Sequence, residues 1–109
     1  MATLTANEPF LFHTGTGDEN FTGVVSWSLK GFVKGLRTVE LKALEFHNRR
    51  GDFEPWAENS LQDKEFARDM GNVRAAKLKG EALRKELVEV AEKRFIELSK
   101  QAQKATRLF

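Results

Sequence analysis

The segment from Phe46 to Trp56 holds the densest group of side chains that could do chemistry. It contains the imidazole of His47, the guanidinium of Arg50 and the carboxylate of Asp52. An imidazole beside a carboxylate can act as an acid–base pair, and with an arginine it can line a site for a small anion or a peptide. The same residues also suit a helix corner, where Asp52 caps the second helix, Arg50 pairs with an acid and Trp56 belongs to the core. We favour this structural interpretation, because corners between helices routinely need a cap and a bridging ion pair.

Other patterns of catalytic or metal-binding residues do not occur in the sequence. There is no cysteine, which excludes thiolate nucleophiles and Cys-ligated metals. His13 and His47 are the only histidines, and they are too far apart to form a helical His pair. The glycine-rich stretch 13–20 has no lysine after its second glycine, and its Asp18 and Glu19 would repel a phosphate. We therefore expect no metal, no cofactor and no catalytic residue, and we lean towards a protein that is not an enzyme.

The formal net charge of +2 is unevenly distributed. Residues 1–37 hold three basic and three acidic side chains, residues 38–73 hold five and eight, and residues 74–109 hold ten and five. A basic last third could attract an anionic partner, so nucleic-acid binding is an alternative function. The candidate basic faces consist of Lys30, Lys34 and Arg37, and of Arg74, Lys77 and Lys79. Charged runs of this kind are more often solvated helix faces than nucleic-acid interfaces.

The elements that must position these residues follow from the apolar pattern. Residues 8–25 form two short apolar runs around a Gly, Asn and Asp cluster, which predicts a β-hairpin or a pair of extended segments. Residues 26–109 show apolar residues at steps of three and four, as in helices. A chain of 109 residues can bury one core. The predicted fold is therefore a single, mainly α domain over residues 1–109, in which the hairpin precedes a four- to five-helix bundle.

Local signals predict the helix boundaries. Ser28 or the serine two residues before it can cap the first helix, and the spacing of Gly31 and Gly35 inside that helix suggests that another backbone approaches closely. Asp52 is expected to cap a short helix over residues 53–59. Gly71 is expected to end the helix after that.

A long amphipathic helix is predicted from about Gly80 to Thr106. It would span ~40 Å, whereas a compact domain of this length is roughly 34 Å across, so part of the helix should overhang. We expect its apolar stripe to contact a second copy in a homodimer. The candidate face consists of Leu87, Phe95, Leu98 and Ala102, and continues towards Ala105, Leu108 and Phe109. The alternative is an elongated monomeric bundle whose hairpin covers the stripe.

The order of several short motifs resembles a family of short uncharacterised proteins from archaea and some bacteria, a domain of unknown function. The most specific part of the resemblance is Phe46-His47-x-x-Arg50-Gly51-Asp52-Phe53-x-x-Trp56. Weaker parts are Phe12-x-Thr14-Gly15, Thr22-Gly23, Ser28-Leu29-x-x-Phe32 and Gly80-Glu81-x-Leu83-Arg84, so the likeness covers residues 10 to 98. The resemblance implies a shared fold and an important corner at His47, and it implies no reaction.

These observations favour a non-catalytic interaction or regulatory module that self-associates, with an unidentified protein as a further possible partner. Nucleic-acid binding is the alternative, and an acid–base enzyme using His47 and Asp52 is less favoured. No apolar run is long enough to cross a membrane, and residues 1–8 lack the features of a signal peptide. We therefore expect a cytoplasmic protein without membrane contact.

Overall fold

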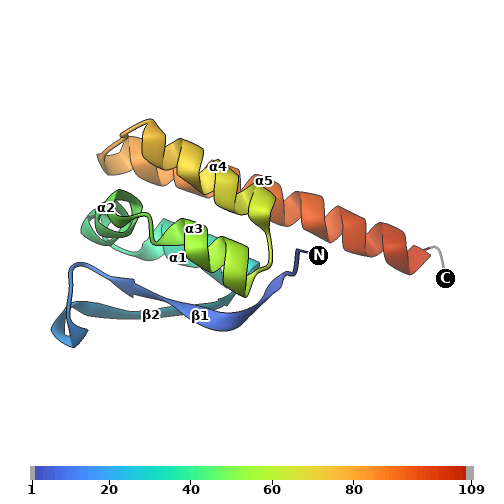
Figure 1. The fold of residues 1–109 in the computed structure, drawn as a ribbon, viewed down its shortest axis with the longest axis horizontal. Coiled ribbons are helices and arrows are strands. Elements are labelled where there is room, and N and C mark those ends of the chain that lie inside the picture. The colour runs from blue at the N-terminus through green and yellow to red at the C-terminus, as the bar shows by residue number, and fades with distance from the viewer. Residues whose placement is uncertain (1, 108–109) are drawn as a thin grey trace.

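A computed structural model shows a two-stranded sheet packed on a helical body, which confirms the predicted mainly α class (Figure 1). It describes residues 2–107, with side chains through residue 104. In chain order the elements are β1 (Thr5–His13), η1 (Asp18–Asn20), β2 (Phe21–Ser28), α1 (Leu29–Thr38), α2 (Leu41–Arg50), α3 (Phe53–Pro55), η2 (Trp56–Ser60), α4 (Lys64–Ala75) and α5 (Gly80–Arg107). The hairpin lies along one side, α1 to α3 form a middle layer, and α4 with α5 cover the opposite side (Figure 1).

The hairpin supplies aromatic side chains to the core. Its strands are antiparallel, with Leu11 opposite Val25 and His13 opposite Phe21. The inner face of β1 carries Phe10 and Phe12, which are buried. A two-stranded hairpin is only marginally stable alone, so the packing of this inner face on the helices holds it in place.

The first helix follows β2 without a loop. The Ser28 hydroxyl accepts the backbone N–H of Gly31 at 3.0 Å and so caps α1. A Cβ on Gly35 would lie 2.5 Å from Cε2 of Phe12. The close neighbour of Gly35 is therefore an aromatic ring of β1, and the prediction of a backbone at this glycine is wrong. At Gly31 a backbone does approach, since a Cβ there would lie 3.8 Å from the Cα of Ser26.

The corner after α2 is built as a left-handed turn and a short helical segment. Gly51 has φ of 72° and ends α2, since such a backbone conformation favours glycine. Helical structure resumes at Phe53 as α3 and continues in η2, a π-helical turn. Asp52 occupies the N-cap position but makes no capping hydrogen bond, contrary to our prediction. Its carboxylate bonds to His47 instead.

Helix α4, unlike α3, begins with an aspartate that makes a capping hydrogen bond. Oδ1 of Asp63 accepts the N–H of Phe66 at 3.0 Å. The same buried carboxylate forms a two-point ion pair with Arg94 of α5, at 2.7 Å from Nε and 3.1 Å from Nη2. Gly71 was predicted to end this helix, yet α4 runs through it to Ala75. The apolar residues around Gly71 bury the helix face and outweigh the low helix propensity of one glycine.

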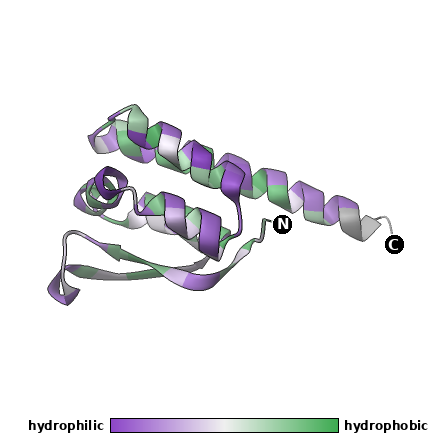
Figure 2. Ribbon diagram, in the orientation of Figure 1, coloured by the Kyte–Doolittle hydropathy of each residue, from purple (hydrophilic) through white to green (hydrophobic). Residues whose placement is uncertain are grey.

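The last helix closes the core with one apolar stripe. Leu83, Leu87, Ala91 and Leu98 are buried, and hydrophobic and hydrophilic residues alternate along α5 (Figure 2). The far part of α5 extends beyond the other elements (Figure 1), and the described molecule measures 48 × 27 × 21 Å. Among the helices that the structure describes, none has both the length and the hydropathy needed to cross a bilayer.

Candidate functional site

The His47 ring joins α2 to the end of β1 and to the turn after α2. Its Nδ1 lies 2.8 Å from Oδ2 of Asp52. On the other side of the ring, the backbone N–H of His13 donates to Nε2 at 2.8 Å. Because Nε2 accepts this bond, Nδ1 carries the proton and donates it to the carboxylate.

This geometry suits a neutral, structural histidine. His47 is buried, and burial lowers its pKa more strongly than the hydrogen bond to Asp52 raises it. A general base needs a ring nitrogen that is free to take a proton from a substrate. Both nitrogens of His47 already bond to the protein, so the arrangement gives no support to an acid–base role for His47 and Asp52.

The other members of the predicted corner lie in different environments. Arg50 is half-exposed, with Nε 3.6 Å from Oδ1 of Asp52 and its guanidinium 4.8 Å from the ring centre of Phe46. Trp56 is buried, and its Nε1–H donates to the carbonyl oxygen of Glu8 at 2.8 Å. A shallow hollow of about 450 Å³ beside the corner is lined by Arg50 and Asp52 and by the glycine-rich loop. The structure thus brings His47, Arg50 and Asp52 together, whereas Trp56 anchors β1 to the core.

The basic face on α1 is partly neutralised. Lys30, Lys34 and Arg37 are exposed on this helix. Arg37 forms an ion pair with Glu92 of α5. The two lysines make no ion pair with any residue that the structure describes. The second basic group, Arg74, Lys77 and Lys79, gathers at the junction between α4 and α5.

The predicted oligomer face on α5 belongs mostly to the chain's own core. Leu87 and Leu98 are buried, and Phe95 is partly buried against the same core. Ala102 is exposed. The expectation of a free face containing Leu87 and Leu98 is therefore wrong, because helices of the same chain cover these side chains. The side chain of Ala105 and the residues Leu108 and Phe109 lie outside the described part of the chain.

A large exposed apolar surface instead lies on the outer side of the hairpin. We call it the hairpin face, and it consists of Leu11, Phe21, Val25 and Trp27. Trp27 is 59% exposed, more than any other large hydrophobic residue described. Of the exposed residues on the two strands, only Glu8 is charged.

Sequence reasoning missed the hairpin face although a signal for it exists. In β2 the apolar Phe21, Val25 and Trp27 alternate with Thr22, Ser26 and Ser28. This alternation would ordinarily put the apolar side inward. The structure turns it outward because Ser28 caps α1 and the Ser26 hydroxyl, which is buried, donates to the carbonyl oxygen of Gly31 at 3.0 Å.

Comparisons with known proteins add no assignment. No protein-family model, no curated protein and no solved structure matches the chain. The resemblance noted from the motif around His47 therefore stays a prediction. Among the described residues, no group of three or more His, Asp or Glu side chains is placed to hold a metal ion.

Proposed function

We propose that this protein is a non-catalytic interaction module that forms a cytoplasmic homodimer through the hairpin face. The observation that carries the proposal is the outward-facing cluster of Leu11, Phe21, Val25 and Trp27. Antiparallel sheets that cover a core usually present a polar face to water. This sheet is apolar on both sides, and an exposed apolar patch of that kind marks an interaction site.

A second copy of the chain is the partner that fits this surface. The exposed residues of the strands carry one charge, Glu8, so two copies can approach without repulsion between like charges at the centre of the contact. In a twofold dimer each hairpin face would pack on the same surface of its partner, with the two sheets about 10 Å apart. Trp27 would be buried in the contact, and buried tryptophans are among the residues that contribute most to binding.

The other functions that the sequence left open receive less support. A nucleic-acid interface on α1 would have to use Lys30 and Lys34, because Arg37 is already paired with Glu92. An acid–base enzyme would need a free nitrogen on His47, and both nitrogens are bonded. The hairpin face, in contrast, can bind a partner without breaking an ion pair or a hydrogen bond of the protein.

Light scattering behind size exclusion tests the proposal on the intact chain. The monomer mass is 12.4 kDa, so a dimer at high micromolar concentration should give about twice that value. Trp27→Lys places a charge on the most exposed residue of the hairpin face and should give the monomer mass. Because Trp27 is exposed, the variant should keep its helical circular dichroism.

A matched control separates a specific interface from general stickiness. Ile96 on α5 is also exposed, at 45%, and lies outside the hairpin face. Ile96→Lys should remain dimeric. A monomeric mass for the unmodified chain would overturn the proposal, and so would a dimer that survives Trp27→Lys or that is lost equally in Ile96→Lys.

A further inference from the structure

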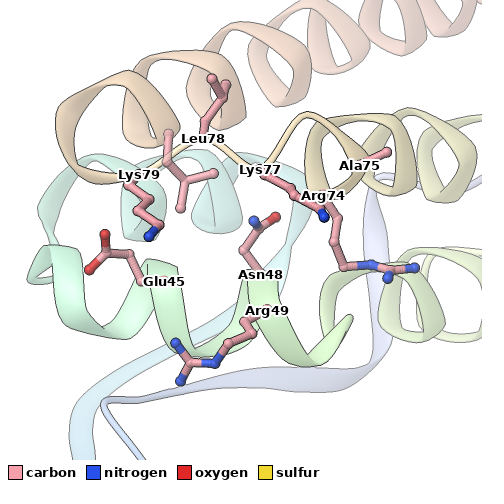
Figure 3. Close-up of a pocket in the computed structure, with 9 residues that line it drawn as sticks. Glu45, Asn48, Arg49, Arg74, Ala75, Lys77, Leu78 and Lys79 are labelled. Atoms are coloured by element: carbon pink, nitrogen blue, oxygen red, sulfur yellow. The ribbon is translucent and has the colours of Figure 1, made fainter.

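A cleft of about 560 Å³ lies between α2 and the junction of α4 with α5, on helices away from the hairpin face (Figure 3). Its volume is in the range of small-molecule sites. The floor is formed by Glu45 and Asn48 of α2, and the opposite side by Lys77, Leu78 and Lys79 of the loop between α4 and α5.

Asn48 is the side chain that points to a ligand. The residue is 6% exposed and its side chain is directed toward the loop that carries Lys77 and Lys79 (Figure 3). Its amide makes no hydrogen bond to any residue that the structure describes, and none of its polar atoms is both sealed from solvent and unpartnered. Buried amides usually bond to protein or to bound molecules. The free bonding capacity of Asn48 therefore opens into the cleft.

The charges around Asn48 favour an anion. Lys77 and Lys79 form no ion pair with a described residue, and Lys79 reaches toward the gap between Glu45 and Asn48 (Figure 3). Arg74 also lines the cleft but is paired with Glu54 at 2.7 Å, and Arg49 is directed away from Asn48 in this view.

Glu45 is the one carboxylate on the floor. Its Oε2 accepts the backbone N–H of Gly80, the first residue of α5, at 3.0 Å. Its other oxygen has no hydrogen-bond donor among the described residues, so it can accept from a hydroxyl group of a ligand. The cleft is thus lined by two exposed lysines, whose side chains extend to opposite sides of Asn48 in Figure 3, by an unused amide and by a carboxylate acceptor.

We propose that this cleft binds a small phosphomonoester that carries hydroxyl groups. The exposed side chains of Lys77 and Lys79 would turn toward the phosphate, the Asn48 amide would donate to a phosphate or hydroxyl oxygen, and Glu45 would accept a hydrogen bond from a hydroxyl group. The apolar wall formed by Ala75, Leu78 and Leu83 would cover the carbon skeleton.

Nuclear magnetic resonance of the ¹⁵N-labelled chain tests the site with defined probes. These are ribose 5-phosphate, adenosine 5′-monophosphate, inorganic phosphate and, as an uncharged control, ribose. Ribose 5-phosphate should shift the side-chain amide signals of Asn48 in a saturable way, and ribose should not. Tighter binding of the nucleotide would add a base to the ligand class, and equal binding would restrict it to phosphorylated polyols.

Two variants and one control locate the binding. Lys77→Gln with Lys79→Gln should weaken ribose 5-phosphate about tenfold, as should Asn48→Ala. The matched control, Lys30→Gln with Lys34→Gln, removes the same charge from α1 and should change the affinity less than about twofold. Because Lys77 and Lys79 are exposed, the first variant tests the site even if Asn48→Ala disturbs folding.

Several results would overturn the proposal. The first is the lack of a saturable Asn48 shift with any phosphate probe up to about 10 mM. The second is an equal loss of affinity in the control variant, which would show general charge attraction. A third is binding of a DNA duplex in preference to all the small probes, which would assign the lysines to a nucleic-acid surface. None of these results bears on the dimer, whose test uses hairpin variants only.

Discussion

At the scale of single residues, His47 is held in one protonation state by its two partners. The backbone N–H of His13 points at Nε2, 2.8 Å away. Protonation of His47 would place a second hydrogen on Nε2 that faces the hydrogen of His13. The hydrogen bond from the His13 N–H to Nε2, which joins β1 to α2, would then be lost. The hydrogen bond from Nδ1 to Asp52 would be kept.

We predict that stability falls when the pH is lowered through the histidine range. The pKa of folded His47 is below its unfolded value of about 6.5. As the pH falls below about 6.5, His47 binds a proton in the unfolded chain before it does so in the folded chain. The contribution of His47 to the free energy of unfolding is therefore complete above about pH 6.5 and is lost as the pH falls through the folded pKa. Urea denaturation at about pH 7.5 and about pH 5.5 measures the loss.

His47→Gln provides the comparison for this prediction. The amide oxygen of glutamine can still accept the His13 N–H, but the side chain does not titrate. We expect the variant to be less stable at neutral pH by roughly 1–3 kcal/mol, because the donor to Asp52 is lost, and to show a smaller pH dependence. An unchanged pH dependence would show that titration of His47 is not its cause.

At the scale of elements, two glycines in helices should respond in opposite ways to alanine. Gly35→Ala would put a Cβ 2.5 Å from the buried ring of Phe12. The nearest atom to a Cβ on Gly71 is Cγ of Glu54 at 3.8 Å, an ordinary contact. Gly35→Ala should cost about 1–3 kcal/mol through overpacking. Gly71→Ala should stabilise the protein by about 0.5–1 kcal/mol, because alanine is the better helix former.

Thermal or chemical denaturation of the two variants checks this contrast. Both substitutions are identical in chemistry and both sit inside a helix, so each serves as the control for the other. Equal changes in the unfolding free energy would contradict the packing of Phe12 against α1.

The elements differ in how far the sequence could predict them. Ser28 and Gly51 were predictable boundaries, because a cap and a left-handed turn need those residue types. The predictions from Asp52 and Gly71 were wrong. The Asp52 carboxylate bonds to His47 and does not cap α3, and the burial of one face of α4 outweighs the low helix propensity of Gly71. The alternation in β2 marks one apolar side of the strand but does not report that Trp27 points outward. The cleft at Asn48 depends on how distant segments pack, and no local pattern reports it.

At the scale of the whole molecule, two arginines attach α5 to the other helices. Arg84 donates to the carbonyl oxygens of Leu36 and Val39 at the end of α1, each at 2.8 Å. These bonds satisfy carbonyl groups that the helix itself leaves unpaired. Arg94 pairs with Asp63 at the start of α4. The negative charge of this carboxylate also interacts favourably with the positive end of the α4 helix dipole.

Loss of the buried pair should be far more damaging than loss of an exposed one. Arg94→Met leaves the carboxylate of Asp63, which is 2% exposed, without its cation. We expect a loss of about 3–5 kcal/mol in the free energy of unfolding.

The control for this prediction is Arg37→Met, which breaks the half-exposed pair with Glu92 between α1 and α5. It should cost less than about 1 kcal/mol. Comparable losses in the two variants, measured by urea denaturation, would mean that Arg94 contributes no more than a surface charge.

The hairpin also has a consequence for synthesis. Its strands leave the ribosome before the helices on which they pack, because the rings that contact Phe10 include those of Phe32, Phe53 and Trp56, and the backbone N–H of Thr3 donates to the carbonyl oxygen of Leu61. Until translation has passed Leu61, a nascent chain therefore presents two uncovered apolar faces. Exposed strands of this kind are prone to aggregate. The hairpin thus needs protection from aggregation, for example by a chaperone, for the time that the ribosome takes to complete the middle layer.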